Sequence, residues 1–183
     1  LERRRAPPWV LAQVPWDGAL EEHFREVVSD GHTRATLCKL AGLLHDVAKP
    51  ATKTVEPDGR IRFLGHPKVG SELTYRIMER LRFSSRETRL VSTMVEEHLR
   101  PGLISRGEGP THRAIYRYFR DAGDVAIDTL FLSLADFLAA RGPLLKRREW
   151  KDYAGGIRGI LETWRDQCSQ TNGIKLIDGH DIK

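Results

Sequence analysis

The most informative chemistry in this 183-residue chain is the adjacent pair His45-Asp46 in the largely apolar phrase LCKLAGLLHDVAK, residues 37–49. A neutral imidazole and a carboxylate together bind a hard-to-borderline divalent cation. An aspartate beside a ligand histidine can also bridge two ions. Lys49 follows about one helical turn later. A dipeptide alone is weak evidence, so a metal site requires further ligands from elsewhere in the chain.

Asp136 is the first additional candidate, because it is the only charged residue from Leu130 to Ala140. An ionised carboxylate in apolar surroundings costs several kcal/mol unless it is paired or bound to a metal. An isolated aspartate of this kind is more often held by an arginine or by backbone donors. The presence of a His-Asp pair in the same chain favours the metal interpretation.

Two histidines extend the candidate ligand set. His98 continues the apolar line of a predicted helix, and His66 stands at a helix start, directly before Pro67. Taken singly, each is better explained as a core histidine or a capping residue. Taken together, ligands at the ends or inner faces of different helices are how helical bundles build metal sites. The candidate metal ligands are therefore His45, Asp46, His66, His98 and Asp136.

The elements that must position these groups are predicted to be helical almost throughout, from apolar residues at a 3.6-residue period. The only strand-like stretch, residues 52–63, contains Glu56-Pro57-Asp58-Gly59, which is turn chemistry and predicts a short hairpin or an extended loop. The fold class is therefore all-α. The helices are expected at about residues 16–28, from Thr33 to Pro50, from Pro67 to Leu81, from Ser84 or Ser85 to Pro101-Gly102, after Thr111, at 124–142 and through Trp150 to Trp164, with a loop at 103–109.

The phrase LLHDVAKPATKTVEPDGRIRFLGHPKVG resembles the HD superfamily of metal-dependent phosphohydrolases. More narrowly, it is similar to the HD domain of bacterial tRNA nucleotidyltransferases and poly(A) polymerase-like proteins. The resemblance runs from about Cys38 to Gly142, and GRIRFLGHPKVG is its most family-specific part. It implies an HD-domain helical bundle with a small hairpin or extended loop after the helix that carries the pair.

The resemblance also implies roles for the candidate residues. His45, Asp46 and Asp136 match the ligands of one metal, and His66 and His98 match the histidines that two-metal members add. Lys49 matches a lysine that contacts phosphate. The implied cofactor is one or two divalent ions of Mn, Ni, Mg, Co or Fe, with Asp46 and Lys49 as the catalytic residues.

The implied activity is hydrolysis of phosphomonoesters or cyclic phosphodiesters of nucleotides or RNA ends. The implied partners are a phosphorylated nucleotide or a tRNA or RNA 3′ end, an upstream nucleotidyltransferase domain in the parent chain, and a second copy in a homodimer. Arg100 and Arg141, the arginines nearest the candidate ligands, are further candidates for phosphate binding, although each is also explained as a solvated surface charge. The alternative function is a non-catalytic HD scaffold that positions tRNA for the upstream domain.

The sequence departs from the family pattern at the first ligand histidine, which should precede the pair. Only His23 and His32 lie upstream. We expect His32 to be exposed in a turn and His23 to be a surface residue of a helix, with the first ligand before Leu1; His23 as that ligand is the alternative. Residues 1–170 are accordingly expected to form an HD domain fragment, and residues 171–183 to begin a following segment of the parent protein.

Composition sets broader bounds. The net charge of +5 and the pI of about 9.4 suit a phosphate-rich ligand but equally suit an ordinary soluble surface. No apolar run approaches the ~20 residues of a membrane span, and no signal peptide is evident, so we expect no membrane partner. Cys38 and Cys168 are far apart in the sequence and are interpreted as reduced thiols of a cytoplasmic protein.

Overall fold

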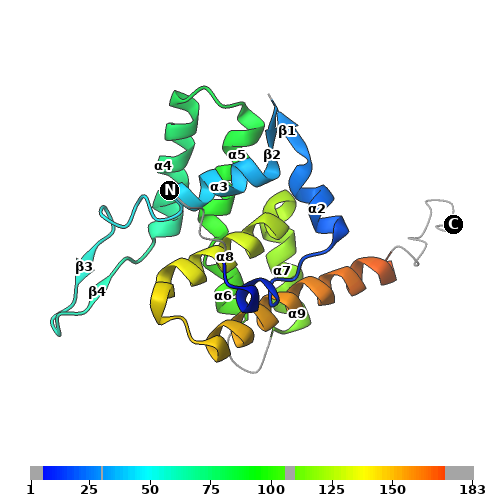
Figure 1. Ribbon diagram of the computed structural model, residues 1–183. Coiled ribbons are helices and arrows are strands. Elements are labelled where there is room, and N and C mark those ends of the chain that lie inside the picture. The colour runs from blue at the N-terminus through cyan, green and yellow to red at the C-terminus, as the bar shows by residue number, and fades with distance from the viewer. Residues whose placement is uncertain (1–5, 30, 106–109, 172–183) are drawn as a thin grey trace, which may run out of the picture.

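The computed structural model describes residues 6–29, 31–105 and 110–171, and these are mostly helical, as predicted (Figure 1). Short 3₁₀ turns at Gly123–Val125 and Gly142–Leu144 flank α8. The helices are α1 (Pro8–Leu11), α2 (Gly18–Arg25), α3 (Arg34–Leu44), α4 (His66–Arg80), α5 (Ser85–Glu97), α6 (Arg100–Ile104), α7 (His112–Ala122), α8 (Ala126–Arg141) and α9 (Arg147–Thr171).

Three helix starts form where the sequence places a hydroxyl. The side chains of Thr33, Ser84 and Thr111 each accept a hydrogen bond from a backbone N–H in the first turn of α3, α5 and α7. Ser84 also forms a reciprocal capping box with Glu87. Because these caps confirm the predicted helix starts, they fix where the helices that carry the candidate ligands begin.

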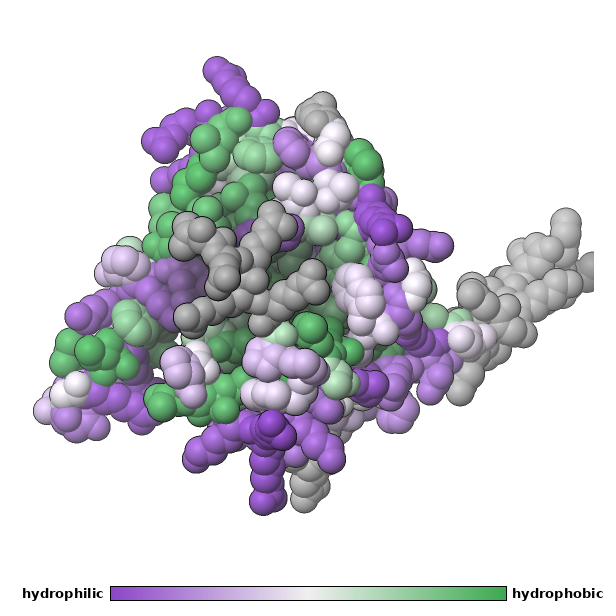
Figure 2. All heavy atoms as spheres, in the orientation of Figure 1, coloured by the Kyte–Doolittle hydropathy of each residue, from purple (hydrophilic) through white to green (hydrophobic). Residues whose placement is uncertain are grey.

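Two small antiparallel hairpins accompany the helices. β3 (Thr54–Val55) pairs with β4 (Ile61–Arg62), which confirms the hairpin predicted within residues 52–63. This hairpin projects from the helical body (Figure 1) and carries both hydrophilic and hydrophobic side chains (Figure 2). β1 (Val27–Ser29) pairs with β2 (His32–Thr33). This second hairpin was not predicted, because the first long helix was expected to continue to Val28.

The chain leaves the helical path before β1 for local reasons. α2 ends at Arg25, and the β-branched pair Val27-Val28 favours an extended backbone. Gly31 then adopts a φ of 82°, which is readily accessible only to glycine. The helix prediction relied on apolar spacing alone and missed this turn.

Two apolar cores share the same central helix. One core lies among α1, α7, α8 and α9, with Trp150 fully buried, and the other lies among α3, α4 and α5. Along α8, Leu130 and Leu134 pack in the first core and Leu132 packs in the second. This double contact explains why the first half of α8 is apolar nearly all round.

The second half of α8 corrects one prediction. A uniformly buried helix was expected, but from Ala135 onward its residues are partly or fully exposed. The Asp136 side chain retains 33% of its exposure, whereas Asp128, one half of the helix earlier, is fully buried. The carboxylate that most needs a buried counter-charge is therefore Asp128 and not Asp136.

Two helix ends also differ from prediction. α3 ends at Leu44 instead of continuing to Pro50, so that His45 is its C-cap. Pro101 does not end a helix: it lies in the first turn of the short helix α6, where its missing N–H has no intrahelical partner to lose. The loop predicted at 103–109 begins only after Ile104, and residues 106–109 lie outside the described part of the chain.

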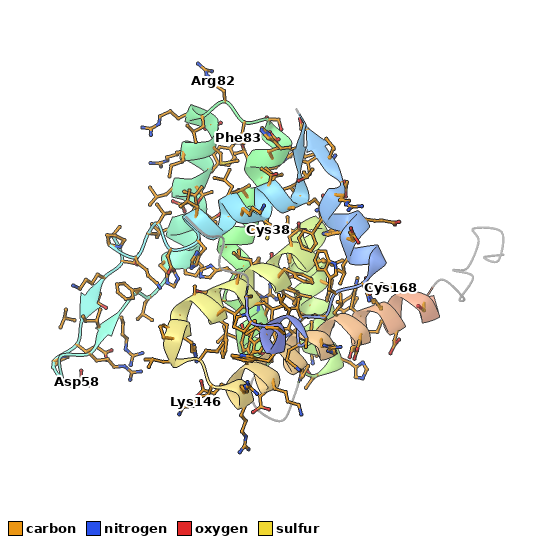
Figure 3. All side chains as sticks on the ribbon, in the orientation of Figure 1. Cys38, Asp58, Arg82, Phe83, Lys146 and Cys168 are labelled. Carbon is orange, nitrogen blue, oxygen red and sulfur yellow. The ribbon has the colours of Figure 1, made fainter. Side chains whose placement is uncertain are left out.

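Other features agree with the sequence. Cys38 on α3 and Cys168 on α9 are free thiols that lie far from each other (Figure 3). In the part of the chain that the structure describes, every helix is too short or too polar to cross a membrane. The predicted boundary near residue 171 coincides with the last described residue, and residues 172–183 lie outside the described structure.

Candidate metal centre

The five candidate ligands come from four separate elements whose ends meet. His45 caps the C-terminus of α3, and Asp46 follows it. His66 is the first residue of α4, and His98 caps the C-terminus of α5. Asp136 belongs to the partly exposed half of α8. We call this group, together with its shared carboxylate, the Asp46 centre.

All three histidines are oriented by the same local hydrogen bond. The Nδ1 atoms of His45, His66 and His98 lie 2.8, 2.8 and 2.6 Å from a backbone carbonyl oxygen three residues earlier. A carbonyl oxygen only accepts, so each Nδ1 carries the proton. In the neutral rings Nε2 is therefore the atom with a free lone pair, and this is the tautomer that a metal-binding histidine needs.

The Nε2 atoms point toward one another and toward the two carboxylates. His66 Nε2 lies 3.4 Å from His98 Nε2 and 3.5 Å from Asp46 Oδ1. Two neutral Nε2 atoms facing each other cannot hydrogen bond, because neither carries a proton. Ligand atoms of Asp46, His66 and His98 all lie within 4.8 Å of one another. A cation between these atoms would satisfy lone pairs that are otherwise left facing each other.

His45 completes a second group on the other oxygen of Asp46. Its Nε2 lies 3.2 Å from Asp46 Oδ2 and 3.4 Å from Asp136 Oδ1, and it is buried without a hydrogen-bond partner in the described structure. The predicted approach of Asp136 to His45 is thus observed. With metal–ligand bonds of about 2.0–2.2 Å, neighbouring ligand atoms around one ion are separated by about 3.0–3.5 Å. The separations in the Asp46 centre fall in this range.

The electrostatics differ between the two sides of the centre. The Asp136 carboxylate raises the pKa of His45, and His45 in turn lowers the pKa of Asp136. Burial has the opposite effect on His98, whose pKa is lowered, so that its neutral form is favoured. A metal competes with protons for these nitrogens, and His98 is therefore ready to bind a metal at a lower pH than His45.

Lys49 lies at the edge of the centre. Its Nζ donates a hydrogen bond to Asp46 Oδ2 over 2.5 Å, and it lies 5.7 Å from the centroid of the Phe63 ring. The side chain keeps 39% of its exposure. Lys49 therefore stands beside the proposed ligands and remains accessible to an anion.

The two arginines predicted to bind phosphate are engaged elsewhere. Arg100 donates to Glu97 and Asp121 at 2.8 and 3.0 Å, and the Arg141 guanidinium stacks over the Phe137 ring at 4.0 Å. In the described structure neither arginine forms a hydrogen bond or ion pair with a member of the Asp46 centre. The structure thus joins Lys49 to the candidate ligands and does not join the arginines to them.

The upstream histidines have other partners. His23 is not a surface residue: its side chain is only 18% exposed, and Nε2 lies 3.1 Å from Asp128 Oδ2. Arg34 binds the same oxygen at 3.1 Å and also bonds to Glu26 and Asp124. We call these five residues the Asp128 network. His32, expected to be exposed, is 40% exposed and has Nδ1 2.7 Å from the buried carboxylate of Glu87.

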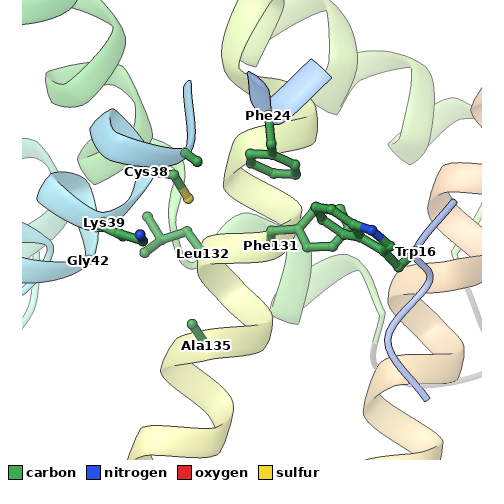
Figure 4. A pocket seen from close by; sticks show the side chains of 9 residues that line it. Trp16, Phe24, Cys38, Lys39, Gly42, Phe131, Leu132 and Ala135 are labelled. Carbon is green, nitrogen blue, oxygen red and sulfur yellow. The ribbon is translucent and has the colours of Figure 1, made fainter. Parts of the chain in front are cut away.

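An apolar pocket of about 290 Å³ opens between α2, α3 and α8 (Figure 4). Its walls are formed largely by Trp16, Phe24, Phe131 and Leu132, and Trp16 stacks on Phe24. Among the described lining residues, only Cys38 and Lys39 add a thiol or a charged group. This pocket lacks the converging lone pairs of the Asp46 centre, so the candidate chemistry lies at the centre.

Comparison with known proteins agrees with this geometry. The HD domain profile matches residues 19–141, which include every candidate ligand. The chain belongs to the HD domain family. Within this HD domain, 115 residues are 36% identical to a CC-adding tRNA nucleotidyltransferase of Thermus thermophilus, and 108 residues are 37% identical to an A-adding tRNA nucleotidyltransferase of Deinococcus radiodurans. These matches cover 62% and 58% of this chain but only 24% of each relative.

The sequence contained a signal for the histidine orientation that composition and periodicity did not use. Each ligand histidine stands at a helix end, three residues after the carbonyl that holds it: Gly42, Phe63 and Val95. At a helix C-terminus the last carbonyls lack backbone partners. A histidine ring in the last turn can therefore supply the missing donor and expose Nε2 at the same time.

Proposed function

We propose that this HD domain is a metal-dependent phosphohydrolase. The observation that carries the proposal is the convergence of three Nε2 atoms and two carboxylates in a group where each Nδ1 is already committed to a carbonyl. Internal hydrogen bonds leave those lone pairs unused, which is the arrangement expected when a divalent ion takes them.

The ligands divide between the two oxygens of Asp46. His45 and Asp136 lie on the Oδ2 side, and His66 and His98 lie on the Oδ1 side. This division supports a bridging role for Asp46 between two ions. The bound metal would lower the pKa of a water molecule and polarise a phosphoryl oxygen. The donor set of imidazole and carboxylate is suited to Mn, Ni, Co or Fe, and also to Mg at the carboxylates.

The remaining roles fall to groups around the ligands. Lys49 neutralises negative charge that develops on the phosphoryl group, because its ammonium lies at the edge of the centre. Asp46 orients the attacking water as well as binding metal. Arg100 and Arg141 would have to leave their present partners to reach a phosphate, so Lys49 is the primary phosphate-binding residue in this proposal.

The proposed substrates are phosphomonoesters or cyclic phosphodiesters of nucleotides or RNA ends. This choice is supported by the two similar proteins, which are named as tRNA nucleotidyltransferases. Because the chain spans 24% of their length, we propose that an upstream nucleotidyltransferase domain accompanies it in a cytoplasmic parent protein. A homodimer is a further proposal.

The test is hydrolysis of p-nitrophenyl phosphate and of a 2′,3′-cyclic nucleotide with added Mn²⁺, Ni²⁺, Co²⁺ or Mg²⁺. Loss of residues that only orient ligands costs about 10–100-fold, so removing a ligand should cost at least about 100-fold. We expect that loss for Asp46→Asn and His66→Gln. The matched variant His23→Gln removes a histidine bonded to Asp128 and should retain the activity. Equal activity in all of these variants would exclude the Asp46 centre as the active site.

A second candidate function is the non-catalytic scaffold that positions tRNA. It is favoured by the names of the similar proteins, which describe nucleotide addition and not hydrolysis. The two functions differ in turnover, so metal binding without hydrolysis, in this chain and in one extended upstream, would favour the scaffold. Tighter metal binding in the extended chain alone would indicate that the first ligand histidine precedes Leu1.

A further inference from the structure

The β3–β4 hairpin and its turn, residues 52–63, form a projecting arm whose root belongs to the Asp46 centre. The carbonyl oxygen of Phe63, at the end of the arm, accepts the hydrogen bond that orients His66. At the other end, Lys49 leads into the arm and lies over the Phe63 ring. Figure 3 places Asp58 at the tip, away from the helical body. The arm therefore extends outward from the atoms proposed to bind metal and phosphate.

The arm carries positive charge that the described structure does not neutralise. Between residues 50 and 68 there are four basic residues and two acidic ones. Arg62 is paired with Glu56 at 2.6 Å. Lys53, Arg60 and Lys68 are exposed and form no ion pair in the described part of the chain. These three cations extend the charge of Lys49 outward along the arm.

The arm also exposes apolar side chains at a place where a short hairpin gains little from them. Val55 and Ile61 are cross-strand partners and are 64% and 50% exposed, and Leu64 at the root is 70% exposed. A two-stranded ribbon of this size is at best marginally stable in water. A partner that covers the arm must therefore offer both apolar surface and negative charge.

A nucleotide strand provides both. Its phosphates match the unpaired cations, and its bases present flat apolar faces that pack on exposed apolar side chains. A mononucleotide bound at Lys49 would leave Arg60, on the far strand of the hairpin, without a partner. The charge pattern thus favours a ligand that continues from the Asp46 centre along the arm.

We propose that the β3–β4 arm binds the nucleotide strand that adjoins the reacting end, so that the substrate is the end of an RNA chain and not a free nucleotide. The reaction at that end rests on the proposed function, whereas strand binding by the arm does not. Because Phe63 holds both His66 and Lys49, a strand seated on the arm also stabilises the orientation of these two side chains.

The test measures binding of a fluorescent single-stranded oligoribonucleotide to the 183-residue chain in EDTA, where no hydrolysis occurs. For single strands, each phosphate contact contributes about 0.7 to the slope of log K against log salt. The variant Lys53→Ala/Arg60→Ala should therefore reduce this slope by about 1.4 and weaken binding about 25-fold at 0.1 M salt. Lys53→Arg/Arg60→Lys, which keeps both charges, should restore the slope.

The matched control is Arg76→Ala/Arg80→Ala, which removes two exposed arginines that have no ion pair in the described structure. Arg80 ends α4, about 20 Å from His66 at 1.5 Å per residue. The control should bind RNA as the wild type does. Equal loss in both double variants, or unchanged binding in the arm variant, would overturn the proposal, as would an arm variant that changes the sedimentation mass in place of RNA affinity. If the wild type binds RNA through the arm but hydrolyses no phosphoester, the proposed function fails and the arm proposal stands.

Discussion

The Asp128 network and the Asp46 centre both place histidine beside carboxylate, yet they differ in where the counter-charge comes from. In the Asp128 network the buried guanidinium of Arg34 bonds to Asp128, Asp124 and Glu26. Only Oδ1 of Asp128 is left without a hydrogen-bond partner in the described network. The network is therefore nearly complete without any ligand.

The Asp46 centre contains no equivalent of Arg34 among the described residues. Its one permanent cation is Lys49, which bonds to the outer side of Asp46 and stays partly exposed. The three Nε2 atoms and the Asp136 carboxylate face inward. The same residue types thus serve stability where the protein supplies the cation, and serve chemistry where that position is left to an ion. Three experiments test this contrast.

The largest effect is expected from Arg34→Ala, because it leaves the fully buried carboxylate of Asp128 without its cation. Removing one partner of a buried ion pair typically costs 3–5 kcal/mol, so we expect the free energy of unfolding to fall by about 3–5 kcal/mol. Urea denaturation followed by circular dichroism gives the value. Arg86→Ala is the matched control, since Arg86 is 52% exposed and lies 3.6 and 3.8 Å from Glu26 and Asp124. It should cost less than about 1 kcal/mol. Similar losses in the two variants would mean that burial does not distinguish the network.

Metal is expected to stabilise the protein through the Asp46 centre and not through the Asp128 network. At a free Ni²⁺ or Mn²⁺ concentration 100 times the dissociation constant, the free energy of unfolding should rise by about 2.7 kcal/mol. His66→Gln should abolish most of this gain, because it removes one of the converging Nε2 atoms. His23→Gln should keep the gain even if it lowers the metal-free stability. The readout is urea denaturation with and without metal, and a gain of equal size in both variants would contradict the assignment.

The contrast also shows what the sequence can reveal. The His-Asp pair and the HD phrase were sufficient to predict the helical bundle, the hairpin at residues 52–63 and the approach of Asp136 to His45. These features depend on local periodicity, turn residues and a family pattern. The roles of the candidate ligands in binding metal stay predictions.

The Asp128 network could not be predicted in the same way. Asp128 and Asp136 stand on one helix with the same spacing of apolar neighbours, and the sequence favoured Asp136 as the buried acid. Which of them is buried depends on α3, whose Arg34 lies 94 residues away in sequence. Likewise, His23 was expected on the surface because its partner comes from α8. Long-range pairings of this kind decide whether a charged side chain is satisfied, and periodicity does not encode them.

The smallest effect is expected at the third histidine–carboxylate contact, His32 with Glu87, which tests whether a satisfied contact responds to acid. Burial raises the pKa of Glu87, but the Ser84 backbone N–H, the Ser84 hydroxyl and His32 together outweigh it, so the pKa is lowered. A carboxyl whose folded pKa is depressed contributes stability above its unfolded pKa, here about 4.5, and that contribution is lost as the pH falls through the folded pKa.

We therefore expect the unfolding free energy of the wild type to fall between about pH 5 and pH 3, and Glu87→Gln to show a shallower fall from a lower starting value. One pKa unit of difference between the folded and unfolded states corresponds to about 1.4 kcal/mol, which bounds the expected change for a shift of that size. Urea denaturation across this pH range gives both slopes, with the exposed carboxylate variant Glu79→Gln as the control. Parallel slopes for wild type and Glu87→Gln would show that acid acts on other carboxylates. Added Ni²⁺ should leave the difference between these slopes unchanged, because every oxygen and nitrogen that holds Glu87 belongs to the protein itself.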